Sequence, residues 1–315
     1  MIELRKDYVL NRWVIIAAER KKRPRDFIKP SVAAVQRTCV FCPGNESMTP
    51  EEIGRINGPD GKWKIRWFPN LYAAAREEGQ KEARTDNTFF TFANAYGSHE
   101  VIVETPRHER QLWDFSAAEF KEVLAVYKQR IEQLSQKESV KYAALFKNHG
   151  PEGGTSLAHS HTQIMSINIP PPLIEAEVAA YKNYPSCPYC SIITIEKNSF
   201  RRCFENNAAV AFTPYASRFN FEIWLFPKRH LRSMSEMTAD ELAAIADLLQ
   251  KTLSKLKELN APYNFVFHYA PDKTNLHFHI ELLPRIATWA GFEFNTDIII
   301  NSVSPEDAAA FYRGE

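Results

Sequence analysis

Hydrophobic and polar positions along the chain follow the same succession of periods twice. In each half an apolar, strand-like segment precedes a long segment whose apolar residues recur at helical spacing, and a second strand-like segment follows. Ser116 and Thr238 precede the two helical segments, and each has a glutamate three residues later, which is the pattern of a capping box. The patterning predicts a strand, a capped helix and a second strand in each half. The predicted segments are 100–108, 116–134 and 143–148, then 219–230, 238–259 and 264–270.

The same order extends to residues that can carry chemistry. Each half begins with a Cys-x-x-Cys pair, has a histidine at the end of its first strand, and closes with a His-x-His run. A shared order of this length indicates two copies of one α+β unit, residues 1–170 and 171–315. The Pro-rich stretch 167–186 is expected to connect them as a short helix with loops. We therefore expect one mostly antiparallel sheet flanked by helices.

The charge and the apolar runs exclude several classes of protein. The formal net charge of 315 residues is +1, so no global field draws the chain to nucleic acid or to a membrane surface. No apolar run reaches the length of a transmembrane helix, and the first residues lack the apolar core of a secretory signal. We expect a cytoplasmic protein, where thiols stay reduced and paired cysteines favour metal ligation over disulfides.

Two tetrahedral zinc sites follow from the repeat. A Cys-x-x-Cys turn supplies two ligands, and the histidines at the strand end and at the His-x-His run supply the other two. Four protein ligands leave no open position, so we expect both ions to be structural. The fifth cysteine, Cys203, has no partner in the pattern and is expected to pack in the core. The predicted ligand sets are Cys39, Cys42, His108 and His159, and Cys187, Cys190, His230 and His277.

His161 is the candidate nucleophile. In an extended segment 159–163, His159, His161 and Gln163 share one face, so an ion on His159 would position His161 without occupying its imidazole. A neutral imidazole attacks activated phosphorus and forms a covalent intermediate. Gln163 can donate to an oxygen of the group under attack. His279 occupies the matching place, but no Gly-rich turn or glutamine accompanies it, so we expect a supporting role there.

Groups that can bind phosphate surround this run. The turn before His159 offers backbone N–H groups and hydroxyls at Gly154, Thr155 and Ser156, and Asn148 adds a side-chain donor. A basic cluster, residues 20–23, contains Arg20 and Arg23, which are able to clamp phosphates or to form a solvated loop.

The chain resembles the galactose-1-phosphate uridylyltransferase family of the histidine-triad superfamily over nearly its whole length. The active-site run of that family reads His-Pro-His-Gly-Gln, whereas this chain has Ser160 and Thr162 at the Pro and Gly positions. The resemblance implies a nucleotidyl group carried by His161 and phosphate contacts from Gln163 and Ser156. It also implies the zinc set at Cys39, phosphate-binding arginines, nucleotide-site asparagines and a sugar-contacting glutamate. The last three groups are Arg20 and Arg23, Asn70 and Asn148, and Glu293.

The resemblance further implies a reaction and an assembly. UDP-glucose would leave UMP on His161, and galactose-1-phosphate would collect it, in a homodimer whose site is completed across the interface. Phe292 replaces an expected tyrosine, and a glutamine expected after Glu293 is missing, so the sugar stays open. The alternatives are an ADP-glucose phosphorylase type of enzyme and a non-catalytic, zinc-stabilised nucleotide-binding protein. Nucleic-acid binding fits the balanced charge poorly.

Overall fold

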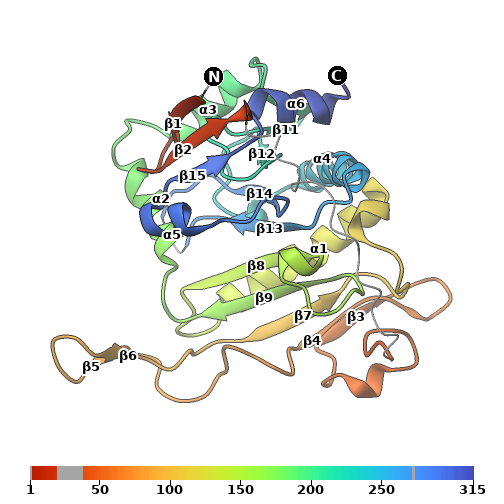
Figure 1. Ribbon diagram of the computed structural model, residues 1–315. Coiled ribbons are helices and arrows are strands. Elements are labelled where there is room, and N and C mark those ends of the chain that lie inside the picture. Colours follow the sequence, from red (N-terminus) through yellow and green to blue (C-terminus); the bar gives the residue numbers. More distant parts are fainter. Residues whose placement is uncertain (1, 20–37, 272–273) are drawn as a thin grey trace.

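Both halves of the chain build a single ten-stranded sheet in the computed structural model, which describes residues 2–19, 38–271 and 274–315 (Figure 1). The strand order is β10–β11–β12–β14–β13–β8–β9–β7–β4–β3, and all neighbours pair antiparallel. The first half contributes β3 (Gly54–Asn57), β4 (Trp63–Pro69), β7 (His99–Val103), β8 (Tyr142–His149) and β9 (His161–Ile167). The second half contributes β10 (Arg202–Glu205), β11 (Ala209–Phe212), β12 (Ile223–Pro227), β13 (Tyr263–His268) and β14 (His279–Pro284).

The two halves meet in the middle of this sheet, where β8 pairs with β13. Outward from the seam, each half repeats the same arrangement, since β9 and β14 are the next strands on either side. The expected α+β fold with one antiparallel sheet is confirmed.

Both long helices begin where the capping boxes predict. Ser116 Oγ accepts the N–H of Glu119, and Thr238 Oγ1 accepts that of Glu241, so each cap satisfies an N–H that has no partner within the helix. The helices are α1 (Ala117–Ser135), α2 (Pro172–Tyr181), α3 (Pro188–Glu196), α4 (Ala239–Glu258), α5 (Gly291–Thr296) and α6 (Pro305–Arg313). The short helix expected in the Pro-rich connection is α2.

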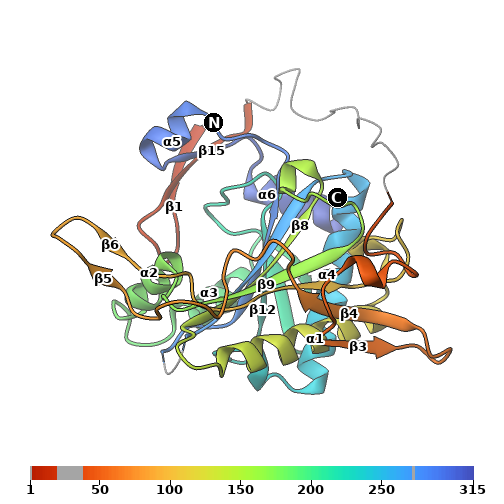
Figure 2. The same ribbon diagram turned by 90° about the horizontal axis from the view of Figure 1, so that it is seen from below.

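Helices α1 and α4 lie side by side on one face of the sheet (Figure 2). Their apolar stripes are buried against the strands, with Tyr127 of α1 packing on the Phe265 and Phe267 rings of β13. Each large apolar side chain buried in this way stabilises the fold by about 1.5–3 kcal/mol. Helices α1 and α4 therefore cover one face of the sheet.

Two strands end earlier than their apolar patterns predict. The strand expected to reach His108 ends at Val103, and the one expected to reach His230 ends at Pro227. Proline is the physical reason in both cases, because Pro106 and Pro227 have no N–H for a ladder. Both histidines therefore lie on turns after the strand, from which they can face a metal site.

A separate three-stranded sheet joins the two ends of the chain. Strands β1 (Ile2–Lys6), β2 (Trp13–Ala17) and β15 (Ile299–Asn301) form it, and β15 pairs parallel with β2. A small hairpin, β5 (Arg84–Thr85) and β6 (Thr91–Phe92), projects from the body of the molecule (Figure 1).

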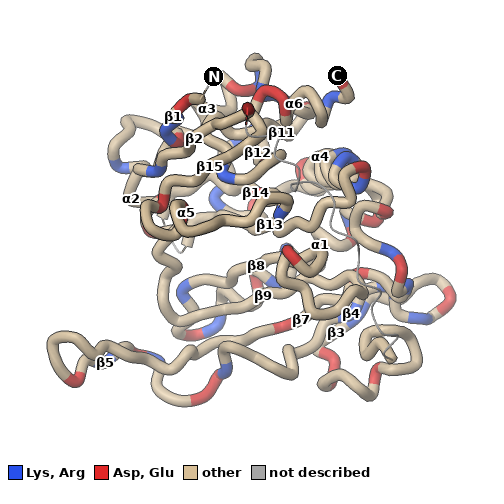
Figure 3. Tube along the Cα trace, viewed as in Figure 1, with Lys and Arg blue, Asp and Glu red and all other residues tan. Residues whose placement is uncertain are grey.

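Positions of both signs are spread along the traced chain (Figure 3). Within the described ranges, no helix combines the length and the apolarity needed to cross a membrane.

Candidate active site and metal centres

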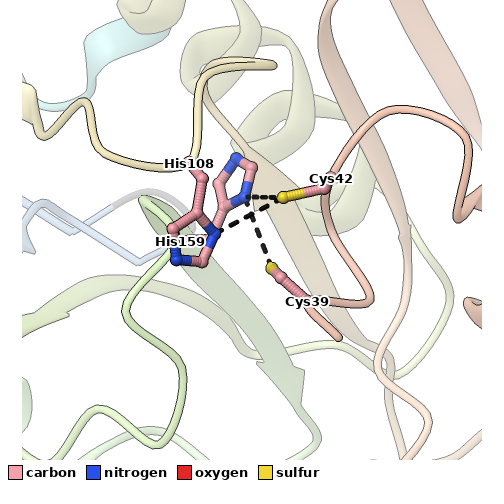
Figure 4. A group of neighbouring side chains, drawn as sticks. All are labelled: Cys39, Cys42, His108 and His159. Carbon is pink, nitrogen blue, oxygen red and sulfur yellow. Dashed lines mark hydrogen bonds between the residues drawn. The ribbon is translucent and has the colours of Figure 1, made fainter. Parts of the chain in front are cut away.

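The four residues of the first predicted zinc set lie close together, with His159 just before the interior strand β9 (Figure 4). The Cys42 Sγ atom lies 3.4 Å from His108 Nδ1 and 3.6 Å from His159 Nδ1, and Cys39 Sγ lies 3.5 Å from His159 Nδ1. Tetrahedral zinc with ordinary Zn–S and Zn–N bonds would separate sulfur from nitrogen by about 3.6 Å. The four donor atoms are therefore spaced as a zinc ion requires.

The surroundings of this set support the same conclusion. His159 Nε2 donates to the Thr105 carbonyl at 2.7 Å, which leaves the Nδ1 lone pair free for a metal. Burial and the neighbouring Cys39 thiol raise the pKa of Cys42 to about 11. A bound cation reverses that shift, because it stabilises the thiolate.

The second predicted set is assembled in the same way from the second half. Cys190 Sγ lies 3.5 Å from both His230 Nδ1 and His277 Nδ1, and Cys187 Sγ lies 4.0 Å from His277 Nδ1. His277 Nε2 donates to the Pro227 carbonyl at 2.9 Å, as His159 does to Thr105. The structure thus contains two possible Cys₂His₂ metal sites, each compatible with zinc.

His161 is the first residue of β9, and its ring is oriented by the backbone. Its Nδ1 donates to the His159 carbonyl at 2.8 Å, which leaves the Nε2 lone pair as the reactive position. The edge of the ring packs against Phe41 from the Cys-x-x-Cys turn, with centroids 5.3 Å apart. The exposed fraction of His161 is 7 %. Burial, followed by the nearby Lys147 charge, lowers the pKa of His161 to about 4, so the ring is neutral at pH 7.

The predicted strand over 159–163 begins two residues later than expected, because His159 and Ser160 do not pair in the sheet. His161 and Gln163 are nevertheless two apart within β9 and share one face. A cavity of 470 Å³, lined in part by Glu46, Arg55 and Lys64, lies beside the turn that contains Cys39 and Cys42. His161 is not among its lining residues.

Gln163 and Asn70, predicted separately, are in contact. Asn70 Nδ2 donates to Gln163 Oε1 at 3.3 Å, and His99 Nε2 lies 2.9 Å from the same oxygen. Asn70 directly follows β4, at the edge of the site face. His99 was not among the predicted site residues, although its polar side chain in an apolar strand was a signal.

Asn148 is held in a similar way from the second half. Asn264 of β13 donates to Asn148 Oδ1 at 2.8 Å and to the Gly153 carbonyl at 2.7 Å. This contact joins the seam strand to the Gly-rich turn, where Gly154 adopts φ +85°. The Thr155 hydroxyl donates to the Leu157 carbonyl at 3.0 Å, and Ser156 follows it in the same turn.

A buried polar network lies behind His161, on the helix side of the sheet. Lys147 Nζ bonds Glu104 at 2.6 Å, Ser160 Oγ at 2.9 Å and the His161 carbonyl at 2.9 Å. Thr162 and Tyr127 also donate to Glu104. Ser160 and Thr162, which replace the Pro and Gly of the expected motif, therefore anchor the nucleophile strand from behind. The sequence motif alone did not indicate this network.

Three predicted substrate residues are not placed beside His161. Arg20 and Arg23 lie outside the described residues. Glu293 caps α5, since its carboxylate accepts the Ala290 N–H at 2.9 Å, and α5 packs against β15 apart from β9 (Figures 1 and 2).

His279 lies in a closed environment. Its ring is fully buried, stacks on Phe226 with centroids 4.7 Å apart, and belongs to a third group of possible metal ligands with Glu177, His268 and Glu281. Within this group the charges are already paired: His268 Nδ1 contacts Glu177 at 2.9 Å, and Arg218 reaches Glu281 at 2.6 Å. Cys203 is buried, as expected.

Comparison with known proteins bears on the family to which the chain belongs. The family model "Galactose-1-phosphate uridyl transferase, N-terminal domain" matches residues 2–171, and "Scavenger mRNA decapping enzyme C-term binding" matches residues 186–286. An ADP-glucose phosphorylase from Arabidopsis thaliana is 34 % identical over 99 % of this chain and 92 % of its own. A galactose-1-phosphate uridylyltransferase from Thermotoga maritima is 29 % identical over 98 % and 97 %. The crystal structure of an Arabidopsis ADP-glucose phosphorylase with bound ADP-glucose superposes with a TM-score of 0.86 at 31 % identity, covering 100 % and 99 % of the chains.

Proposed function

Because the chain belongs to the galactose-1-phosphate uridyl transferase family, we propose that His161 takes a nucleoside monophosphate from a nucleotide-sugar and passes it to a phosphate acceptor. The family makes the chain an enzyme of nucleotidyltransferase type. The assignment to His161 is carried by its hydrogen bond to the His159 carbonyl, which leaves Nε2 as a nucleophile, together with its residual exposure and the neighbouring Gln163.

The proposed reaction has two displacements at the α-phosphorus. In the first, the His161 Nε2 lone pair forms an N–P bond, and the sugar phosphate leaves with the electron pair of the bridging oxygen. In the second, an oxygen of the acceptor phosphate attacks phosphorus, and the N–P pair returns to Nε2. The ring carries a positive charge between the steps, and its Nδ1–H remains bonded to the His159 carbonyl. No proton has to move, so no general acid is required.

We propose zinc in both Cys₂His₂ sets, with a structural role. An ion on Cys39, Cys42, His108 and His159 would hold the His159 carbonyl in place for His161. Gln163, Asn148 and the N–H groups of the Gly-rich turn would bind the phosphate oxygens. Asn70 is assigned to the nucleotide, and Ser156, Gly154 and Thr155 to the phosphates. Arg20, Arg23 and Glu293 are proposed to act on the substrate from segments that are not described or lie apart from β9.

Two substrate pairs are candidates. UDP-glucose with galactose-1-phosphate is the pair that the uridylyltransferase relatives suggest. ADP-glucose with free phosphate is favoured by the 34 % identical phosphorylase and by the complex that contains ADP-glucose. Phe292, where the family pattern has a tyrosine, leaves the sugar open between the two pairs.

The test is competitive labelling in a single turnover. Enzyme is mixed with UDP-glucose and ADP-glucose that carry different labels on the α-phosphate, and is then denatured. We expect an acid-labile, alkali-stable adduct on His161, and its label identifies the base. Acceptor preference follows from adding galactose-1-phosphate or inorganic phosphate to the labelled enzyme. Tight nucleotide binding without an adduct would leave only the non-catalytic, zinc-stabilised nucleotide-binding protein.

We further propose a homodimer in the cytoplasm, with two units at residues 1–170 and 171–315. The three-stranded sheet qualifies that division, because β1 and β2 of the first unit pair with β15 of the second. Gel filtration with light scattering measures the assembly state directly.

A further inference from the structure

The ring of His99 has a defined tautomer. His99 starts β7, next to the nucleophile strand, and is 9 % exposed. Its Nδ1 lies 3.2 Å from the backbone N–H of Ala74, which can only donate, so Nδ1 must be the acceptor. The proton of a neutral ring is therefore on Nε2. Burial lowers the pKa of His99, which favours this neutral form.

The His99 tautomer fixes the orientation of the Gln163 carboxamide. His99 Nε2 donates to Gln163 Oε1 at 2.9 Å, and the opposite assignment would place the Gln163 NH₂ against an N–H. Asn70 gives the same answer independently. Its Oδ1 accepts the Tyr72 N–H at 2.9 Å, so its Nδ2 is the donor that reaches Gln163 Oε1 at 3.3 Å. His99 Nε2 and Asn70 Nδ2 lie 3.3 Å apart because both donate to the same acceptor, Gln163 Oε1.

A carboxamide carries its oxygen and its nitrogen on opposite sides of one carbon. With Oε1 held by two donors, the NH₂ of Gln163 points away from His99 and Asn70. Gln163 lies on the same face of the sheet as His161. In the pairing of β7 with β9, His161 is opposite Val103 and Gln163 is opposite Val101. We propose that His99 is a positioning residue that presents the Gln163 N–H to the phosphate attacked by His161; the inference rests on the proposed function.

The orientation of the Gln163 carboxamide decides whether its contact with a phosphoryl oxygen is attractive or repulsive. A donor aimed at a phosphoryl oxygen stabilises the charge that develops there, and it does so at no reorganisation cost if it is fixed beforehand. A flipped amide would set its oxygen against the same anion. A free carboxamide can adopt either orientation, so the two anchored donors supply what Gln163 alone lacks.

The test compares two substitutions that each keep one nitrogen of the ring. His99→Asn keeps a polar atom near Nδ1 but cannot reach Gln163, whereas His99→Gln keeps a donor near Nε2. We expect His99→Asn to slow formation of the His161 adduct by about 10- to 100-fold, the range for misaligning one hydrogen bond to a charged oxygen. His99→Gln should recover most of that rate. Equal losses in both variants would overturn the inference.

A double-mutant cycle with Gln163→Ala separates positioning from general damage. Once the carboxamide is removed, His99→Asn should cost no more than about twofold further, since nothing is left to orient. Effects that multiply in full would show that His99 acts through the fold, and the inference would fail.

Nitrogen chemical shifts of labelled histidines test the same point without activity. In long-range ¹H–¹⁵N spectra of the wild-type protein, the signals lost in His99→Gln should be those of an Nε2–H tautomer. An Nδ1–H tautomer would overturn the inference even if all variants fold poorly. If the wild-type enzyme forms no adduct with either nucleotide-sugar, the proposed function fails, and the tautomer still decides the orientation of Gln163.

Discussion

The two halves of the molecule place a histidine at the start of corresponding strands, and the exposed fraction is 7 % for His161 and 0 % for His279. His161 opens β9 and His279 opens β14, and each Nδ1 donates to the carbonyl of the histidine two residues earlier, at 2.8 and 3.0 Å. His159 and His277 each face a Cys-x-x-Cys turn. The backbone geometry of a nucleophile is therefore present twice.

The surroundings differ. His161 retains some exposure beside Gln163, whereas His279 is fully buried, and its Nε2 finds no hydrogen-bond partner among the described residues. Glu281 stands at the position of Gln163 and is paired with Arg218. A carboxylate there would repel phosphate. Both halves share the histidine and the preceding histidine that faces the Cys-x-x-Cys turn, so we expect exposure and the residue two positions later to determine which histidine can react.

Matched substitutions of the two histidines are the strongest way to break this comparison. Asparagine keeps a donor for the preceding carbonyl but has no nucleophilic nitrogen. We expect His161→Asn to reduce adduct formation by about 10⁴-fold or more, as loss of a nucleophile does elsewhere. His279→Asn should change it by about twofold at most. The measurement is single-turnover labelling, and an adduct that survives in His161→Asn but not in His279→Asn would reverse the assignment.

The buried ion pairs near the two histidines should contribute similarly to stability. Lys147 with Glu104, and Arg218 with Glu222 and Glu281, are nearly inaccessible. Lys147→Met and Arg218→Met should each lower the free energy of unfolding by about 3–5 kcal/mol, because buried carboxylates lose the cation that balances their charge. Urea unfolding measures the loss. Adding Glu104→Gln to Lys147→Met should recover part of it, and an absence of recovery would contradict the pairing.

The two ligand sets differ in their neighbours, because the carbonyl of His159 in the first set accepts a hydrogen bond from the proposed nucleophile His161. Cys42→Ser and Cys190→Ser should each remove one equivalent of zinc, as measured by plasma mass spectrometry. We expect the first to slow adduct formation by about tenfold or more, since His159 loses its anchor. The second should lower the melting temperature without that effect. Equal effects on the rate would show that both ions support catalysis.

The smallest expected difference lies in the helix caps, where the halves should behave alike. Arg110 and Arg229 hydrogen-bond Glu119 and Glu241 and hold the pKa of each carboxyl at about 2, below its usual value. Depressed pKa values contribute stability above about pH 4.5 that is lost as the pH falls towards 2. Glu119→Gln and Glu241→Gln should each cost about 1 kcal/mol or less at pH 7, because both pairs lie near solvent. Acid unfolding curves test this, and each variant should show a flatter dependence over that range.

Local patterns predicted much of the fold. The caps at Ser116 and Thr238 depend on residues three apart, and the ligand sets depend on a repeat that one sequence displays. Such signals need no knowledge of distant contacts.

Contacts between distant segments could not be predicted in this way. Glu104, Lys147 and Ser160 are joined only through strand register, and no short motif encodes their meeting. The contact of His99 with Gln163 depends likewise on the pairing of β7 with β9. Pro106 and Pro227 were visible in the sequence, but both strands were expected to continue to His108 and His230.

The seam between β8 and β13 has a consequence for the parts of the molecule. A polypeptide made from either half alone would carry a bare row of amide and carbonyl groups along one of these strands, and such a row readily recruits another chain. A second copy of the same half would supply a matching antiparallel border. A gene that encoded one unit would thus have yielded a self-complementary pair, and fusing two copies would have freed one member to lose its reactive centre while still completing the sheet.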